Sequence, residues 1–207
     1  SHYMRLEASG GQFLVPGSGA PLCQPAAAWH AAFFAEGMRL GFQPICSLSY
    51  ELLAQHCPAS WQQRAFNGDP ARTGWAPPSA LLSPASGPAM AWLQSVGAAF
   101  VALMQEAGAV VRFQVGEPWW WIMPDGRPCL YDSAALAALG GSPPEIADMR
   151  QPMSAPQKAL LDDAGALLAS STAALVNAVR AAASPDPAES LLLTFLPGVL
   201  DPAMPEA

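Results

Sequence analysis

Positive charge is scarce in this sequence of 207 residues, which has 9 lysines and arginines against 16 aspartates and glutamates and a formal net charge of −7. Lys158 is the single lysine. Proteins that bind nucleic acid need clustered cations to neutralise phosphates, so the charge balance argues against a nucleic-acid partner. Charged residues are also few overall, at 12% against 52% hydrophobic residues, and this composition excludes a disordered chain.

Long apolar runs are missing as well. We find no run of about 18 apolar residues free of charge, so the sequence predicts no membrane span. The first residues have neither a charged segment nor the apolar segment that follows it in a secretory signal. No P-loop, GxGxxG or GxSxG motif is present, so NTPase, dinucleotide and serine hydrolase chemistry have no support and no cofactor is predicted.

The four cysteines have no metal-binding spacing. Cys23, Cys46, Cys57 and Cys129 form no CxxC pair, and His56-Cys57 is the only histidine–cysteine neighbour pair. Adjacent side chains point apart on both helices and strands, so this pair does not form a site by itself. We therefore expect free, buried thiols and no metal.

Length and pattern predict one α/β domain. A chain of this size can form a single core, and Met4 is preceded by Ser-His-Tyr, so we expect residues 1–207 to be a single domain cut from a larger protein. Helical periodicity marks four segments, 25–40, 86–107, 133–139 and 156–183. Strands are predicted at 42–50, 110–115 and 191–196, with a weaker one at 6–15. The alternation favours parallel β/α units, as in a TIM-barrel-like fold or a partial barrel.

Two of these units end on a glutamate. GFQPICSLSYE closes on Glu51 and GAVVRFQVGE closes on Glu117, each after a helix, a glycine and a strand. The carboxyl ends of parallel strands lie on one side of the sheet, so the two carboxylates are predicted to emerge together. Such a pair suits glycoside chemistry, with one carboxyl as acid and the other as nucleophile or base. We predict Glu117 as the general acid/base and Glu51 as the second carboxylate.

Tryptophans surround the predicted strand ends. Flat indole faces pack on the apolar faces of sugar rings, so the candidate sugar-binding residues are Trp61, Trp75, Trp119, Trp120 and Trp121. The last three directly follow Glu117-Pro118 and open a segment, residues 119–131, that contains PDG and predicts a hairpin. Indole surface beside Glu117 would desolvate its carboxyl group and raise its pKa toward that of a useful acid.

Each of these residues also has a structural interpretation. The tryptophan triplet could be hydrophobic lining or a contact with another protein, because tryptophan is enriched at interface hot spots. Glu51 could begin a helix in YELLAQHC, where a carboxylate favours the helix N-terminus. Asp132, in LYDSAA, is predicted as a helix N-cap. A non-catalytic structural or adhesion module therefore stays open beside the enzyme, as does a small-molecule binding protein.

The strand-end GEP followed by aromatic residues is similar to the acid/base strand of retaining glycoside hydrolases with TIM barrels, in which an Asn-Glu-Pro turn is common; here Gly116 stands in the asparagine position. More broadly, residues 26–132 resemble the glycosidase-like barrel domains in tail proteins of bacteriophages and gene transfer agents. The resemblance is carried by FxxGMRLGFQPICSLSYELL, by the segment from Trp61 to TGWAPPSALLSP, and by FQVGEPWWW with CLYD.

This resemblance implies a virion protein whose barrel cleaves or binds cell-surface polysaccharide. It also implies other tail or structural proteins as partners, while virion and cytoplasm both stay open as locations. Of the residues of that family, Glu117 alone carries over to this chain. A full barrel has eight strands, and only four are predicted here.

Overall fold

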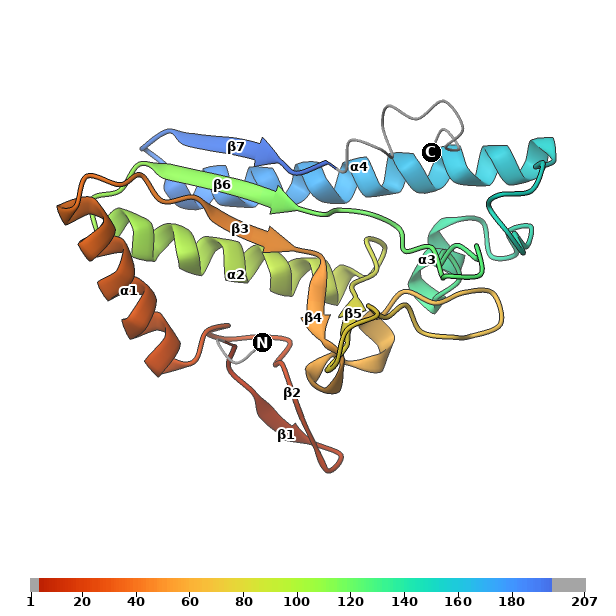
Figure 1. Cartoon of the computed structure of the whole chain (residues 1–207), viewed down its shortest axis with the longest axis horizontal. Coiled ribbons are helices and arrows are strands. Elements are labelled where there is room, and N and C mark those ends of the chain that lie inside the picture. Colours follow the sequence, from red (N-terminus) through yellow and green to blue (C-terminus); the bar gives the residue numbers. More distant parts are fainter. Residues whose placement is uncertain (1–3, 195–207) are drawn as a thin grey trace.

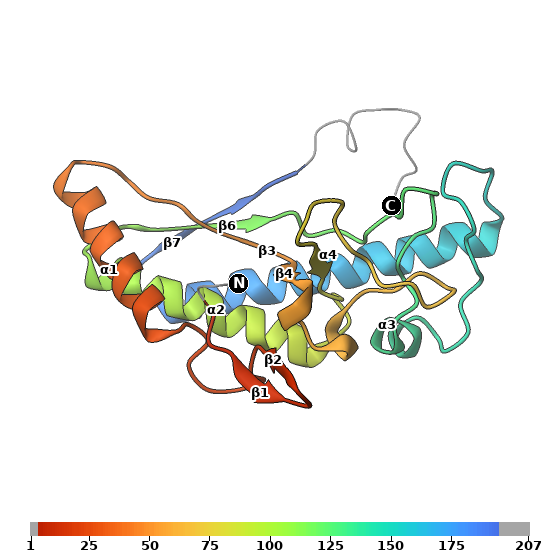
Figure 2. The same ribbon diagram turned by 60° about the horizontal axis from the view of Figure 1, so that its bottom comes forward.

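A three-stranded parallel sheet, with strand order β3-β6-β7, lies at the centre of the computed structural model, which describes residues 4–194. Strand β3 spans Cys46–Ser49, β6 spans Val111–Gly116 and β7 spans Ala188–Leu192. Helix α2 (Gly87–Glu106) precedes β6, helix α4 (Ala155–Ala183) precedes β7, and the two helices run side by side along the sheet (Figures 1 and 2). The predicted parallel β/α units are therefore present.

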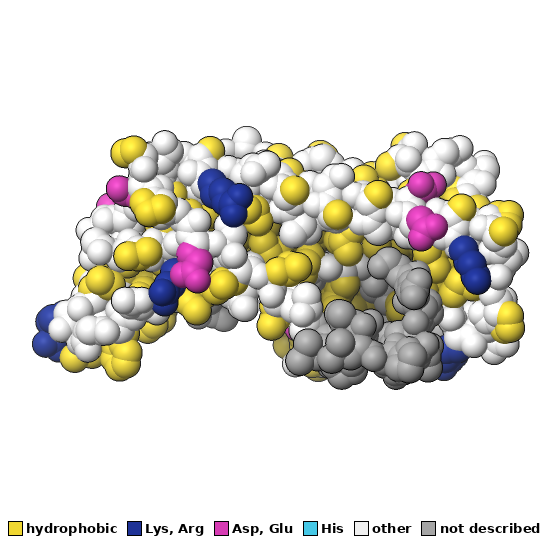
Figure 3. All heavy atoms as spheres, turned by 90° about the horizontal axis from the view of Figure 1, so that it is seen from above, with side chains coloured by type: hydrophobic (Ala, Val, Ile, Leu, Met, Phe, Trp, Pro, Cys, Tyr) yellow, Lys and Arg dark blue, Asp and Glu magenta, His cyan; other side chains and the backbone are white. Residues whose placement is uncertain are grey.

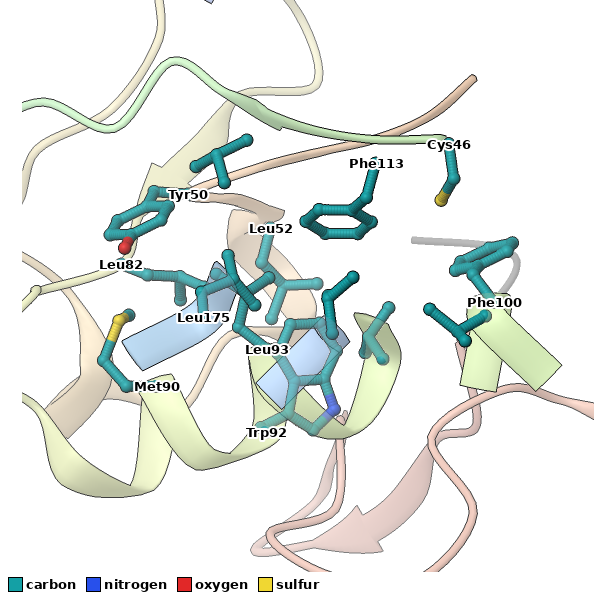
Figure 4. Packing of buried hydrophobic residues seen from close by; sticks show 14 of the residues in the cluster. Cys46, Tyr50, Leu52, Leu82, Met90, Trp92, Leu93, Phe100, Phe113 and Leu175 are labelled. Atoms are coloured by element: carbon teal, nitrogen blue, oxygen red, sulfur yellow. The ribbon is translucent and has the colours of Figure 1, made fainter. Parts of the chain in front are cut away.

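The core lies between the sheet and these two helices. Val111, Phe113 and Val115 alternate with Arg112 and Gln114 along β6, and only the first three are buried. Figure 4 shows Phe113 packed in a cluster that includes Leu93 and Phe100 of α2 and Leu175 of α4. Alternation of this kind places every second strand residue against the helices and leaves the others on the opposite face of the sheet.

That opposite face is more polar. Arg112 of β6 forms an ion pair with Glu189 of β7, with 2.8 Å between Nε and Oε2, and these two residues are register partners. Ser47 of β3 and Gln114 of β6 are also register partners on this face. Within residues 4–194 the parallel sheet has β3 at one edge and β7 at the other. The described strands therefore do not close into a barrel.

The helix ends follow ordinary capping chemistry. The Ser86 hydroxyl accepts a hydrogen bond from the backbone N–H of Ala89 at the start of α2. At the start of α4, Ser154 and Gln157 form a reciprocal capping box. Helices α1 (Gln24–Arg39) and α3 (Ser133–Ala138) complete the set, and all four helices agree with the predicted segments to within two residues.

Helices α2 and α4 are each long and apolar enough to cross a membrane when only length and composition are considered. This weighs little, because the core helices of soluble proteins meet the same two conditions. In α2, 50% of the apolar 18-residue stretch is buried inside the fold, and in α4 28% of the corresponding stretch is buried. The sequence predicted no membrane span at either helix, and their apolar stripes pack against each other and the sheet.

The strand predictions need three corrections. Residues 6–15 form an antiparallel hairpin, β1 (Glu7–Ser9) and β2 (Gln12–Leu14), outside the parallel sheet, because Gly10 and Gly11 turn the chain with positive φ. Glu51 begins strand β4 (Glu51–Leu53), which pairs antiparallel with β5 (Ser79–Leu81), so the alternative that it begins a helix is wrong. Strand β7 starts three residues before the predicted 191, and residues 195–196 of that prediction lie outside the described chain.

Candidate functional site

The strand register brings Glu51 and Glu117 together. Ser49 of β3 pairs with Gly116 of β6, so both chains leave the parallel sheet at the same level. Tyr50 follows Ser49, is fully buried, and bonds through its hydroxyl to the Ser171 hydroxyl at 3.0 Å. This buried tyrosine fixes the exit of β3. The predicted placement of the two glutamates on the same side of the sheet is therefore confirmed.

Glu117 has an unusual backbone conformation. Its φ of 51° makes it the one non-glycine residue with positive φ among residues 4–194. Side chains rarely adopt this left-handed conformation, and where they do the surrounding structure holds them there. Gly116 beside it is tightly surrounded, because an added Cβ would lie 3.1 Å from the Ser47 hydroxyl oxygen and 3.4 Å from the Leu48 carbonyl oxygen. An asparagine at 116 would therefore require its neighbours to shift.

The two carboxyl groups lie within hydrogen-bonding reach of each other, and Ser79 of β5 also reaches Glu51. Burial and then the negative charge of Glu117 raise the pKa of Glu51, while Ser79 acts in the opposite direction.

The tryptophan triplet that follows is packed on both of its sides. Trp119 and Trp121 meet edge to face, with ring centroids 6.3 Å apart, and pack against a small buried cluster of Ala65, Ala71, Leu81 and Cys129. Trp120 points the other way, where its indole N–H donates to the Ala164 carbonyl of α4 at 2.9 Å. All three are half-buried, so each indole already makes contacts within the chain.

Gln63 fastens this segment and was not identified from the sequence. Its side chain is fully buried, and its amide nitrogen donates to the carbonyl oxygens of Leu82 and Trp119, both at 3.0 Å. Its amide oxygen accepts from the backbone N–H of Trp121 at 2.7 Å. A glutamine in the loop sequence WQQRAF gives no signal of burial, because that residue type is mostly exposed in proteins.

The two remaining tryptophans differ from each other. Trp61 is 5% exposed and packs against Trp92 of α2, with ring centroids 6.0 Å apart, so it belongs to the core and has no face for a sugar. Trp75 is 58% exposed. It lies in the loop whose ends are joined by Thr73 and Ser79, the residue that reaches Glu51. Of the predicted sugar-binding residues, Trp75 has the most accessible indole.

Asp132 and three of the four cysteines keep the structural roles predicted from the sequence, whereas Cys23 is only partly buried. Asp132 caps α3, because its Oδ1 accepts hydrogen bonds from the backbone N–H groups of Ala134 and Ala135, at 3.1 Å each. The thiols of Cys46, Cys57 and Cys129 are buried, and burial raises the pKa of each to about 12. Within residues 4–194, no three histidine, cysteine or acidic side chains come together in a way that could hold a metal ion.

The predicted hairpin at 119–131 is present as a short antiparallel ribbon. Ile122 bridges to Pro128, and the backbone N–H of Met123 donates to the Arg127 carbonyl at 2.8 Å. Arg127 also joins this hairpin to the neighbouring loop through Asp69, at 2.9 Å. The carboxyl end of the sheet is therefore covered by a connected set of loops rather than by an isolated turn.

The parallel β/α units, with acidic and aromatic residues at their carboxyl ends, define a mixed α/β domain with a parallel sheet. A family model described as the TIM barrel of non-contractile tail sheath proteins matches residues 1–207. The chain therefore belongs to this family and is a domain related to phage tails. No curated protein and no solved structure matches it. The predicted relation to tail barrels is confirmed, whereas its glycosidase-like character has no support in these comparisons.

Proposed function

We propose that this domain is a structural module of a tail, and that it contacts neighbouring tail proteins rather than cleaving polysaccharide. This proposal corresponds to the structural alternative raised by the sequence. Membership of a tail sheath family supports it. The packing of the tryptophan triplet also supports it, since indoles engaged within the chain offer little open surface to a sugar.

The observation that carries the proposal is a concentration of exposed apolar side chains at one place in the chain. Five large apolar residues between positions 29 and 45, on α1 and the loop after it, are 50% to 66% exposed: Trp29, Phe33, Leu40, Phe42 and Ile45. Trp29 and Phe33 stack face to face, with ring centroids 5.3 Å apart. We call these five residues the α1 patch. Exposed large apolar side chains concentrated in one segment are typical of contacts between proteins.

One face of the molecule carries few charged side chains. In the view from above, Figure 3 shows apolar and uncharged groups over most of the described part of this face, with scattered Lys, Arg, Asp and Glu side chains. The ion pair of Arg39 with Glu36 at the end of α1 leaves no net charge at that point. A partner at the α1 patch would therefore be another tail protein with an apolar surface of its own.

The test is incorporation into tails. Phe33→Ser combined with Phe42→Ser makes the α1 patch polar without changing a buried side chain, since both residues are more than half exposed. We expect this double variant to enter assembled tails less than the wild type, measured by quantitative mass spectrometry of purified tails. Ile122→Ser, at a residue that is 40% exposed and outside the patch, is the control and should assemble normally.

Two outcomes would overturn the proposal. Normal incorporation of the double variant would remove the role of the α1 patch. Turnover of a polysaccharide by the wild-type chain that Glu117→Gln abolishes would replace the structural function with catalysis. A panel of bacterial cell-wall and capsule polysaccharides, offered to both proteins, is the assay for the second outcome.

Carbohydrate binding is a second candidate, and the exposure of Trp75 favours it. This indole is 58% exposed and lies in the loop that holds Ser79 against Glu51. A sugar ring could stack on Trp75 while the carboxylates of the two glutamates accept hydrogen bonds from its hydroxyl groups. In this candidate, Glu51, Glu117 and Trp75 would bind the polysaccharide. The partly exposed Trp119, Trp120 and Trp121 would add to this surface, whereas the buried Trp61 would take no part. Trp75→Ala should then weaken binding to a glycan array, whereas an unchanged binding profile would reject it.

A further inference from the structure

The loop from Ala65 to Asp69 contains an asparagine that is followed by a glycine. Asn67 and Gly68 are both exposed to solvent, whereas Ala65 at the beginning of the loop is buried. The sequence has one other asparagine, Asn177, which lies within α4 and is followed by an alanine. The chain therefore has one exposed Asn-Gly pair and, in a helix, a second asparagine for comparison.

An Asn-Gly pair can lose the side-chain amide of its asparagine. The backbone nitrogen of the glycine gives up its proton to solvent and attacks Cγ of the asparagine, which closes a succinimide ring. The Cγ–Nδ2 bond breaks, and Nδ2 takes a proton from water and leaves as ammonia. Water then opens the ring and leaves aspartate or isoaspartate. Glycine favours the attack because it has no Cβ to obstruct the approach of its nitrogen.

The conformation of this loop brings the two reacting groups together. Oδ1 of Asn67 accepts a hydrogen bond from the backbone N–H of Asp69 at 3.2 Å, so the side chain is folded back along the chain that follows it. Such an Asx turn places Cγ beside the next backbone nitrogen, which belongs to Gly68. An added Cβ at Gly68 would meet nothing within 4 Å, so the approach is open.

Two hydrogen bonds oppose the reaction in the folded chain. The backbone N–H of Gly68 donates to the carbonyl oxygen of Ala65 at 2.9 Å, so the attacking nitrogen is already engaged. Nδ2 of Asn67, which has to leave, donates to Oδ2 of Asp69 at 2.7 Å. The loop therefore holds the reacting groups close to each other and at the same time restrains both of them.

Arg127 stabilises the second of these restraints. Its Nη1 lies 2.9 Å from the same Oδ2 atom of Asp69, and its Nη2 lies 2.8 Å from Oδ2 of Asp125. The Arg127 side chain is 16% exposed, and these two carboxylates hold it on both sides. The guanidinium therefore fixes Asp69 in the position from which Asp69 binds the amide of Asn67.

We propose that Asn67 is a modification site at which the chain converts its own asparagine into aspartate or isoaspartate, and that the Asp69–Arg127 ion pair slows this conversion by restraining the leaving nitrogen. The reaction consumes water, releases ammonia and needs no other reactant. Its product has a carboxylate where the amide was, so Asp69 loses a hydrogen-bond donor and gains a neighbour of like charge. The site is independent of the proposed tail function.

The experiment is incubation of the purified full chain at neutral pH, followed by peptide mapping with mass spectrometry. Conversion is detected as the mass gain of an amide replaced by a carboxyl group, and chromatography separates the aspartate peptide from the isoaspartate peptide. We expect product at Asn67 and none at Asn177 over the same period. The chain unfolded in guanidinium chloride should react faster at Asn67, because both restraints of the loop are then absent.

Three variants make the result specific. Arg127→Gln frees Asp69 and should speed the conversion of Asn67 about two- to fivefold, the factor that corresponds to the loss of an ion pair near the surface. Arg150→Gln removes the neighbouring ion pair with Asp148 and should leave the rate at Asn67 unchanged. Asn67→Gln should give no product at this position, because its longer side chain would have to close a larger ring.

Absence of product at Asn67 in the folded wild type, over a period in which the unfolded chain is fully converted, would overturn the modification site. An unchanged rate in folded Arg127→Gln would overturn the role of the ion pair, as would an equal acceleration in Arg150→Gln. Amide NMR spectra of each variant establish that it is folded. Should Arg127→Gln fail to fold, Asp69→Ala removes the same restraint from the other side of the ion pair.

Discussion

The tryptophans of this domain include both buried side chains, which stabilise the fold, and side chains exposed to solvent. Trp61 and Trp75 stand in similar Pro- and Gly-rich surroundings in the sequence, yet one is 5% and the other 58% exposed. The difference comes from Trp92 of α2, which provides Trp61 with an aromatic neighbour. Because Trp61 and Trp92 are 31 residues apart in the sequence, the residues next to Trp61 do not indicate that it is buried.

Replacing these two tryptophans should therefore have unequal effects on stability. Trp61→Ala removes a buried aromatic side chain and should lower the free energy of unfolding by about 3–5 kcal/mol. Trp75→Ala should change it by less than about 0.5 kcal/mol, as for most surface substitutions. Urea denaturation of both variants measures the difference. Similar losses for the two would contradict the assignment of Trp61 to the core.

The carboxyl pair also predicts how stability depends on pH. Because folding raises the pKa of Glu51, the folded chain binds its proton more tightly than the unfolded chain. The stability linked to Glu51 is thus fully present below the ordinary glutamate pKa and is lost as pH rises through the raised pKa. Glu51→Gln should flatten this part of the stability profile, measured by urea denaturation at a series of pH values, while Glu145→Gln should leave it unchanged.

At the scale of elements, the helices were predicted well and the short strands were not. Helices α2 and α4 have long apolar stripes and terminal caps, and these local signals place their ends to within two residues. Strands β4 and β5 have three residues each and arise from pairing between distant segments, Glu51 with Leu81 and Leu53 with Ser79. Nothing within either triplet indicates its partner.

The cap of α3 offers one test at this scale. Both N–H groups at the start of this short helix are bonded to Oδ1 of Asp132, which is 3% exposed. Asp132→Ala should cost about 0.5–2 kcal/mol of stability, as loss of an N-cap generally does. Asp132→Asn keeps an acceptor oxygen and should stay close to wild type. Equal losses in the two variants would show that the cap is not the source of the effect.

The contact between helices α2 and α4 offers a second test at the scale of elements. An added Cβ at Gly97 would lie 3.1 Å from Cγ2 of Val179 and 3.6 Å from the Phe113 ring, so this glycine allows the two helices and the sheet to approach. Gly97→Val should destabilise the chain by about 1–3 kcal/mol through overpacking. Gly37→Ala, in α1 with open space around it, should instead stabilise by about 0.5–1 kcal/mol. Thermal unfolding measures both changes.

At the scale of the whole molecule, the sequence predicted the parallel β/α arrangement and the meeting of Glu51 with Glu117, because strand direction determines both. It did not predict the closeness of the two carboxyls or the buried role of Gln63, which depend on side-chain geometry across segments. The number of strands in the parallel sheet was also overestimated, since the predicted first strand forms a separate hairpin.

An enzyme and a structural module would use different surfaces of the whole molecule. A catalytic domain would use its carboxyl edge, with Glu117 and the tryptophans facing a substrate. A structural module would use exposed apolar surface, as at the α1 patch, where Phe42 is 66% exposed. Membership of the tail sheath family favours the second.

The most direct test of this account is photo-crosslinking in assembled tails. A benzophenone amino acid is introduced at Phe42, in the α1 patch, or at Ala169, on the exposed side of α4, and cross-linked peptides are identified by mass spectrometry. The account predicts cross-links from position 42 to a neighbouring tail polypeptide and few or none from position 169. Assembled tails with no cross-link at position 42, or with equal cross-linking at both positions, would contradict it.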